Sequence, residues 1–164
     1  MIKITLPDGS VKEFAKGTTP MDVAKSISEG LARNVISASF NGTTVESSTA
    51  LEADGDLVLF TWNDKEGKKA FWHSTSHVMA QVLEEMYPGI KLTLGPAIDN
   101  GFYYDVDFCE AKISEADFKK IEDRMLEISR EKHEFTLRPV SKAEALELYK
   151  GNEFKTELIQ NLED

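Results

Sequence analysis

Two of the three histidines of the chain, His73 and His77, lie four residues apart. On a helix this spacing places both imidazoles on one face, one turn apart. Such a pair can supply two metal ligands, or a general base beside a donor that holds a water molecule. Ser74 stands where a zinc protease of similar spacing needs a catalytic glutamate, and the remaining histidine, His133, offers no visible third ligand. The alternative is a pair that only caps the helix or faces solvent.

A second candidate segment is GPAIDNGFYYD at residues 95–105. Its glycines and proline predict tight turns that lead into a strand, and strand alternation puts Tyr103 and Tyr104 on opposite faces. One ring can then pack in the core while the other lines a cleft. By residue type alone, Lys155 is one lysine among many. Cys109, the single cysteine, cannot form an internal disulfide, and we expect it to be a passive packing residue.

The first 62 residues predict a sheet around one helix. A Pro-Asp-Gly turn at 7–9 and the hairpin signal Asn-Gly at 41–42 separate alternating apolar segments. Thr19 before Pro20 predicts the start of a helix that ends at Gly30. The predicted strands are 2–6, 11–14, 35–40, 43–45 and 57–60. This order is typical of a β-grasp.

The polar stretch 63–69 predicts a linker, so we expect two domains, 1–62 and 63–164. After the linker the pattern predicts a helix over 70–87, strands over 91–94 and 102–108, and a helix from Ser114 to about residue 132. A strand over 135–140, a helix from Ser141 to near Gly151 and a helical segment over 153–162 follow. The second region is therefore α+β. We expect it to be truncated at its C-terminus, because no stop signal follows the last helical segment.

Composition restricts the class of protein. The chain of 164 residues is 41% hydrophobic and 29% charged, and its formal net charge is −10. These values, the lack of a long apolar run or a signal peptide, and the single cysteine predict a globular protein of the cytoplasm that does not enter a membrane. A uniformly acidic surface does not attract RNA, so we expect any RNA contact of this part to be local and weak.

The motifs together resemble one family. The segments ITLPDGS at 4–10 and PMDVA at 20–24 resemble a TGS domain, a ubiquitin-like β-grasp module of threonyl-tRNA synthetases, stringent-response nucleotide synthetases and some Obg-related GTPases. The segments HSTSH at 73–77 and 95–105 resemble the editing domain of bacterial threonyl-tRNA synthetases. The resemblance covers essentially the whole chain. It implies an α+β protein in which a TGS β-grasp domain precedes part of an editing domain.

That family's editing domain hydrolyses serine wrongly attached to threonine tRNA. By position, the resemblance implies a pocket of His73, His77, Tyr104 and Lys155. The parent enzyme is an ATP-dependent ligase and a homodimer whose ATP and zinc sites lie in a catalytic body outside this chain, so we expect no cofactor or metal here and infer no dimer of this part. The family completes the editing pocket with a Cys-x-x-x-His element. Cys109 has no histidine four residues later, so the pocket is expected to be incomplete.

Two other readings remain open. A zinc-dependent tRNA deacylase would use the histidine pair as metal ligands, although the TGS module in front argues against it. A non-enzymatic TGS module that senses tRNA or a protein would make the pair structural. A stringent-response parent fits less well, because its enzymatic motifs precede the TGS domain.

Overall fold

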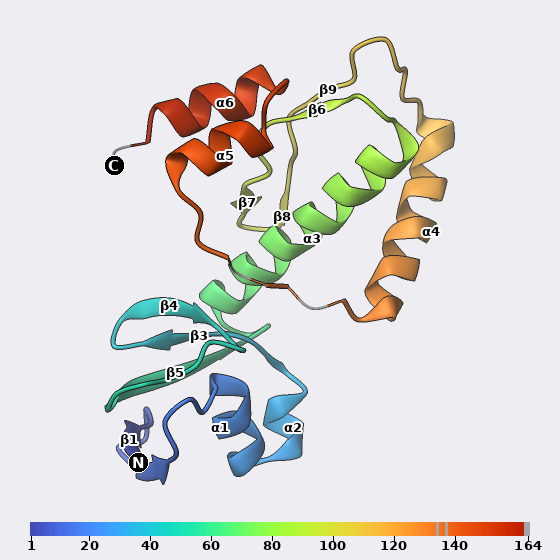
Figure 1. Cartoon of the computed structure of the whole chain (residues 1–164). Coiled ribbons are helices and arrows are strands. Elements are labelled where there is room, and N and C mark those ends of the chain that lie inside the picture. Colours follow the sequence, from blue (N-terminus) through green and yellow to red (C-terminus); the bar gives the residue numbers. More distant parts are fainter. Residues whose placement is uncertain (134, 137, 163–164) are drawn as a thin grey trace. The chain divides into compact units, whose positions relative to one another are not determined.

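The computed structural model describes residues 1–133, 135–136 and 138–162. The chain divides into two compact units, Met1–Trp72 and His73–Asp164, which are described separately (Figure 1). No helix in the described ranges is long and apolar enough to cross a membrane.

The first unit is a mixed five-stranded sheet with two helices. Its strands are β1 (Ile2–Thr5), β2 (Val11–Phe14), β3 (Val35–Phe40), β4 (Thr43–Glu46) and β5 (Gly55–Thr61), in the order β2-β1-β5-β3-β4. β1 runs parallel to β5, and the other neighbours are antiparallel. The helices α1 (Pro20–Ile27) and α2 (Glu29–Ala32) lie against one face of the sheet (Figure 1). This is the predicted β-grasp.

The core of this unit follows from strand alternation. Ile2 and Ile4 point inward from β1 and are almost fully buried, together with Val23 of α1 and Leu57 of β5. Their burial removes apolar surface from water, which is the main favourable term in folding. The alternating pattern of the first strand therefore predicts the buried face of the sheet correctly.

Two predicted helix boundaries in this region are wrong. The first helix ends before Gly30, because Ser28 is extended (φ −165°) and its side chain accepts a hydrogen bond from Leu31 N, which starts α2. The helix α3 (Lys65–Met86) begins five residues before the predicted start at residue 70. Asp64 Oδ2 accepts from Thr61 N at 2.7 Å and holds the chain in a turn just before it. Residues 65–69 are therefore helix rather than linker.

The start of α3 at Lys65 requires a glycine at position 67, because the helix passes close to the backbone of Thr61 there. A Cβ at this position would overlap the backbone carbonyl of Thr61. We expect Gly67→Ala to destabilise the chain by about 1–3 kcal/mol, because backbone must move to relieve the overlap. Gly30→Ala is the matched control. Gly30 is also helical, but a Cβ there would lie at an ordinary contact distance of 3.9 Å from Ser28 Oγ, so the variant should gain up to about 1 kcal/mol from helix propensity. Urea unfolding measures both; a Gly67→Ala chain as stable as wild type would contradict this account.

The second unit contains most of α3, four short strands and three more helices. The strands are β6 (Lys91–Leu92), β7 (Ala97–Ile98), β8 (Gly101–Phe102) and β9 (Val106–Asp107), and the helices are α4 (Glu115–Glu131), α5 (Lys142–Leu148) and α6 (Glu153–Gln160). β6 pairs with β9 and β7 with β8, both antiparallel. Val82 and Leu83 of α3 form a buried core with Ile121 and Ile128 of α4.

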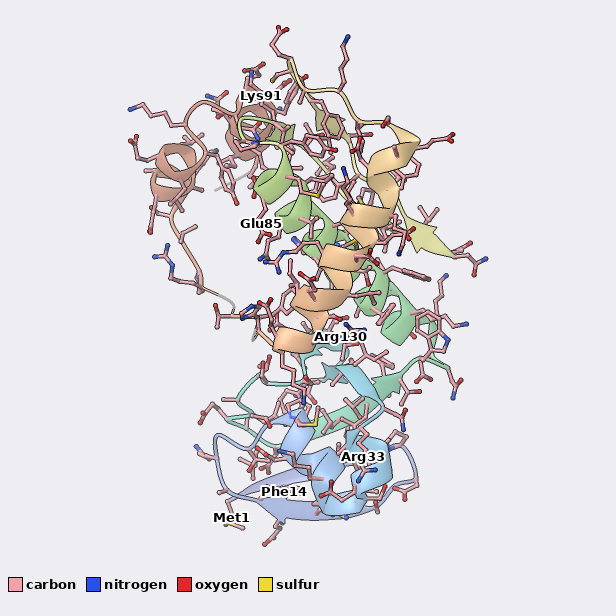
Figure 2. All side chains as sticks on the ribbon, turned by 90° about the vertical axis from the view of Figure 1, so that its right-hand side faces the viewer. Met1, Phe14, Arg33, Glu85, Lys91 and Arg130 are labelled. Atoms are coloured by element: carbon pink, nitrogen blue, oxygen red, sulfur yellow. The ribbon has the colours of Figure 1, made fainter. Side chains whose placement is uncertain are left out.

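Polar contacts at the edge of this core keep α3 and α4 in register. Glu85 lies on the side of α3 that faces α4 (Figure 2), and its Oε2 accepts from Arg124 Nε at 2.9 Å.

The predicted cap of α4 is present, because Asp117 Oδ2 accepts from both N and Oγ of Ser114.

Two strand predictions in this unit are corrected. The strand predicted over 102–108 is interrupted: only Phe102 lies in β8 and only Val106 and Asp107 lie in β9. No strand forms in residues 135–136 and 138–140, because none of the paired strands in the described ranges lies alongside them; Leu137 lies outside the described residues. An apolar run becomes a strand only where a neighbour completes its backbone hydrogen bonds.

Candidate functional site

The two histidines meet on α3 as their spacing predicts. The Nε2 atoms of His73 and His77 are 3.1 Å apart, and the rings are nearly perpendicular with centroids 4.6 Å apart. At this distance one imidazole donates a hydrogen bond and the other accepts it, and the tautomers of the two rings decide which is the donor. Ser76 lies buried behind them, and its Oγ is 2.7 Å from the carbonyl oxygen of His73 and 3.0 Å from that of Gly95.

A cavity of about 580 Å³ opens beside the pair. His77, Tyr104 and Lys155 all line it. His73 is not one of the lining residues, but its Nε2 lies 3.1 Å from that of His77. The structure therefore brings three of the four predicted site residues to one cavity and places the fourth in contact with His77. Other polar or aromatic residues of the wall are Gln81, Glu84, Lys91, Tyr149, Lys150 and Asn152.

Tyr104 is held in the wall by its neighbours. The backbone of the following residue is paired, because Asp105 N donates to Leu94 O at 2.9 Å and Asp105 O accepts from Thr93 N at 3.0 Å. The Tyr104 ring lies directly on Gly95, where a Cβ would overlap the ring carbons. Tyr103 is 52% exposed and does not line the cavity, so the expectation of one ring lining a cleft fits Tyr104, whereas the expectation that the other ring packs in the core is wrong. Burial, with the charge of Glu84, raises the pKa of Tyr104 and keeps its hydroxyl a neutral donor.

Lys155 enters the cavity from the first turn of α6. Its Nζ lies 5.2 Å from the ring centroid of Tyr149, which is a cation–π distance. Asn152 caps the helix: its Oδ1 accepts from Lys155 N at 3.1 Å, and its Nδ2 donates to Leu92 O at 2.8 Å. Lys91, beside this helix in Figure 2, forms an ion pair with Glu153 at 2.7 Å.

The electrostatics of the cavity favour a neutral imidazole at His77. Burial lowers the pKa of His77, and the positive charges of His73 and Lys155 lower it further, although one side of the ring is open to solvent. A neutral imidazole with a lowered pKa can accept a proton near neutral pH, which is the requirement for a general base.

The lowered pKa has a consequence for stability. An unfolded His77 titrates near 6.5, whereas the folded one binds a proton only at lower pH. The unfolded state therefore binds more protons as the pH falls below about 6.5, and the contribution of His77 to stability, fully present above that pH, is lost as the pH falls toward the folded pKa. We expect the unfolding free energy of His77→Gln to fall less than that of wild type between pH 7.5 and 5.5. Urea unfolding at both pH values measures this, and an equal fall would contradict it.

Sequence reasoning missed several wall residues. Gln81 and Glu84 lie four and seven positions after His77 on α3, so a polar stripe at helical spacing was the signal that could have found them. Asn152 stands directly before Glu153 and could have been recognised as an N-cap. Tyr149 carries no comparable signal.

Two other expectations concern metals and the cysteine. Within residues 1–133, 135–136 and 138–162, no three histidine, cysteine, aspartate or glutamate side chains are grouped so that they could hold a metal ion. Cys109 is exposed and lies with its Sγ 3.7 Å from Gly89 O, so its expected role as a packing residue is wrong. The left-handed backbone at Cys109 (φ 52°) places it in a turn after β9 rather than in a core.

Comparison with known proteins gives two further findings. The family model "TGS domain" matches residues 2–61. All 164 residues align with proteins named "Threonine--tRNA ligase": one from Flavobacterium psychrophilum is 82% identical, one from Flavobacterium johnsoniae 78%, and one from Cytophaga hutchinsonii 48%. The chain spans about a quarter of the length of these curated relatives.

Proposed function

We propose that the chain serves as the N-terminal region of a threonine-tRNA ligase. The premise is that it carries a TGS domain and is similar along its whole length to that region of such ligases. Its second unit then contributes part of a site that hydrolyses serine wrongly esterified to threonine tRNA. The observation that carries the second step is the arrangement of His77, Tyr104 and Lys155 around one cavity, with His73 in contact with His77.

The cavity offers the groups that ester hydrolysis needs. The reaction requires an oriented water, a base near neutral pH and donors for the developing oxyanion. His73 and His77 suit the first two tasks, because either imidazole can take a proton from water while its neighbour shares the charge. Lys155 as an ammonium and Tyr104 as a neutral phenol suit the third. The oxygen of the water molecule attacks the carbonyl carbon of the ester, and the proton of the water passes to the imidazole. The bond between the carbonyl carbon and the ribose oxygen then breaks, and the imidazole returns the proton to the leaving ribose oxygen.

The need for a second site follows from substrate size. Serine lacks one methyl group of threonine, and such a difference is worth only about 1–3 kcal/mol in a binding pocket. The site that attaches threonine to tRNA therefore also attaches some serine. A separate hydrolytic cavity that accepts the serine ester and excludes the threonine ester removes the error.

The remaining parts of the proposal concern the longer protein. Attachment of threonine with ATP, a zinc site and homodimer formation are assigned to the ligase as a whole. Threonine tRNA is the partner, and the cytoplasm is the compartment. With a net charge of −10, this part should contribute little RNA affinity by itself.

The two alternative functions make different demands. A zinc-dependent deacylase would need further ligands beside the histidine pair, and the relatives named as ligases favour the synthetase. A purely regulatory module has no use for a base, a phenol and an ammonium group around one cavity.

The test of the proposed function is hydrolysis of esterified tRNA by the full-length ligase that contains this chain. We expect it to hydrolyse serine on threonine tRNA faster than threonine on the same tRNA, because the second sieve selects by size. Release of radiolabelled amino acid measures both rates, with heat-inactivated enzyme as the control. Serine ester that decays at the uncatalysed rate would reject the hydrolytic function while leaving the ligase assignment intact.

A further inference from the structure

We propose that Asn152 is a positioning residue that holds the ammonium group of Lys155 beside the histidine pair, with the ring of Tyr149 as a second support. This inference rests on the proposed function of the same cavity. It concerns the turn between α5 and α6, which supplies no atom to the chemistry described above.

Asn152 joins two elements with one side chain. Its Oδ1 accepts from the backbone N of Lys155 in α6, and its Nδ2 donates at 2.8 Å to the carbonyl of Leu92 in β6, sixty residues earlier in the chain. A helix N-cap alone needs only an acceptor, which serine or aspartate supplies as well. The amide is required for acceptance and donation together. The side chain therefore ties α6 to β6 besides capping it.

A second contact, an ion pair, joins the residues next to Leu92 in β6 and to Asn152 at the start of α6. Lys91 precedes Leu92, Glu153 follows Asn152, and Lys91 Nζ donates to both carboxylate oxygens of Glu153 at 2.7 and 2.8 Å. An ion pair this exposed contributes little by itself. Together with the less exposed hydrogen bonds of Asn152 to Leu92 and Lys155, this ion pair limits rotation of the first turn of α6, which carries Lys155.

The same turn also orients the end of the lysine side chain. Asn152 N donates to Tyr149 O at 3.0 Å, and the Tyr149 ring faces Lys155 Nζ at 5.2 Å from its centroid. A lysine side chain has many rotamers, and attraction to the ring face favours those that keep the ammonium near the cavity. Backbone position and side-chain direction are thus set by residues 149–152.

The charge environment of His77 provides a readout of where this ammonium lies. His73 on α3 and Lys155 on α6 act directly on the charge of His77. The other charged or titratable side chains of the cavity wall are Glu84, Lys91, Tyr104, Tyr149 and Lys150. The positive charge of Lys155 opposes protonation of His77 and therefore depresses its titration.

The first experiment follows the His77 imidazole by NMR titration of the 164-residue chain. Lys155→Met should raise the pKa of His77, because a positive neighbour is lost. Asn152→Ser keeps an acceptor for the cap of α6 but lacks the donor to Leu92, and it should shift His77 in the same direction. Ser141→Ala, which removes the equivalent cap from α5, is the matched control and should leave the titration unchanged.

A second pair of variants tests the aromatic support. Tyr149→Leu should raise the pKa of His77, whereas Tyr149→Phe, which retains the ring face, should restore wild-type behaviour. In the full-length ligase, Asn152→Ser and Tyr149→Leu should each lower kcat for serine-ester hydrolysis about tenfold with little change in KM, because a misplaced group loses catalytic effect more than binding.

The outcomes separate the two levels of inference. A His77 titration that moves in Lys155→Met but not in Asn152→Ser overturns the positioning role. A titration unmoved in Lys155→Met overturns it too, because the ammonium is then not beside the imidazole. Absence of ester hydrolysis by the wild-type ligase rejects the proposed function, and the titrations still decide the positioning of Lys155.

Discussion

Replacing His77 by alanine in the full-length ligase is expected to lower the rate of serine-ester hydrolysis by about 10²- to 10⁴-fold. The same loss is expected for His73→Ala. In this structure the two Nε2 atoms are 3.1 Å apart, so removal of either ring leaves the other without its proton partner. An imidazole that acts as the base without a second imidazole beside it lacks the hydrogen bond that would stabilise its positive charge after protonation.

Threonine attachment should survive both changes, because it is proposed to occur at a separate site outside these residues. The comparison of hydrolysis with aminoacylation in one preparation therefore distinguishes a local chemical loss from misfolding. His133→Ala is the matched control: this histidine is exposed after α4 and contacts Glu131 rather than the cavity. Unchanged hydrolysis in His73→Ala and His77→Ala would assign the pair a structural role.

Local patterns carry much of the fold. Alternation in 2–6, the Asn-Gly hairpin signal and the N-cap Thr19 before Pro20 each concern neighbours within a few residues, and each predicts its element correctly. The predictions fail where the outcome depends on contacts that no recognised sequence pattern describes. Residues 65–69 look like a linker by composition, yet Asp64 and Gly67 start a helix against Thr61. Residues 135–140 look like a strand, yet no neighbour completes one in the described part of that stretch.

The candidate site divides in the same way. Helical spacing alone predicts the meeting of His73 and His77. The assignment of Tyr104 and Lys155 to their cavity comes only from family resemblance, because no local pattern relates α6 to α3. Asn152 joins residues sixty positions apart, and such a contact becomes visible only in three dimensions.

Gly95→Ala is expected to damage the cavity without replacing any group that acts on the substrate. The added Cβ would overlap the Tyr104 ring and come within 3.1 Å of Ser76 Oγ, so the ring must move. Overpacking of this kind costs about 1–3 kcal/mol of stability. Displacement of the Tyr104 hydroxyl by about 1 Å should lower serine-ester hydrolysis by roughly tenfold to a hundredfold, while threonine attachment is retained.

A double-mutant cycle identifies the ring as the cause. In a Tyr104→Ala background the space above Gly95 is open, so adding Gly95→Ala should cost much less stability and little further activity. The expected coupling between the two positions is about 0.5–3 kcal/mol in unfolding free energy, as for other residues in contact. Additive effects would mean that Gly95→Ala acts through Ser76 instead. Ser76 Oγ lies 3.0 Å from Gly95 O and 2.7 Å from His73 O, so in that case the histidine pair rather than the phenol would be the part that moves.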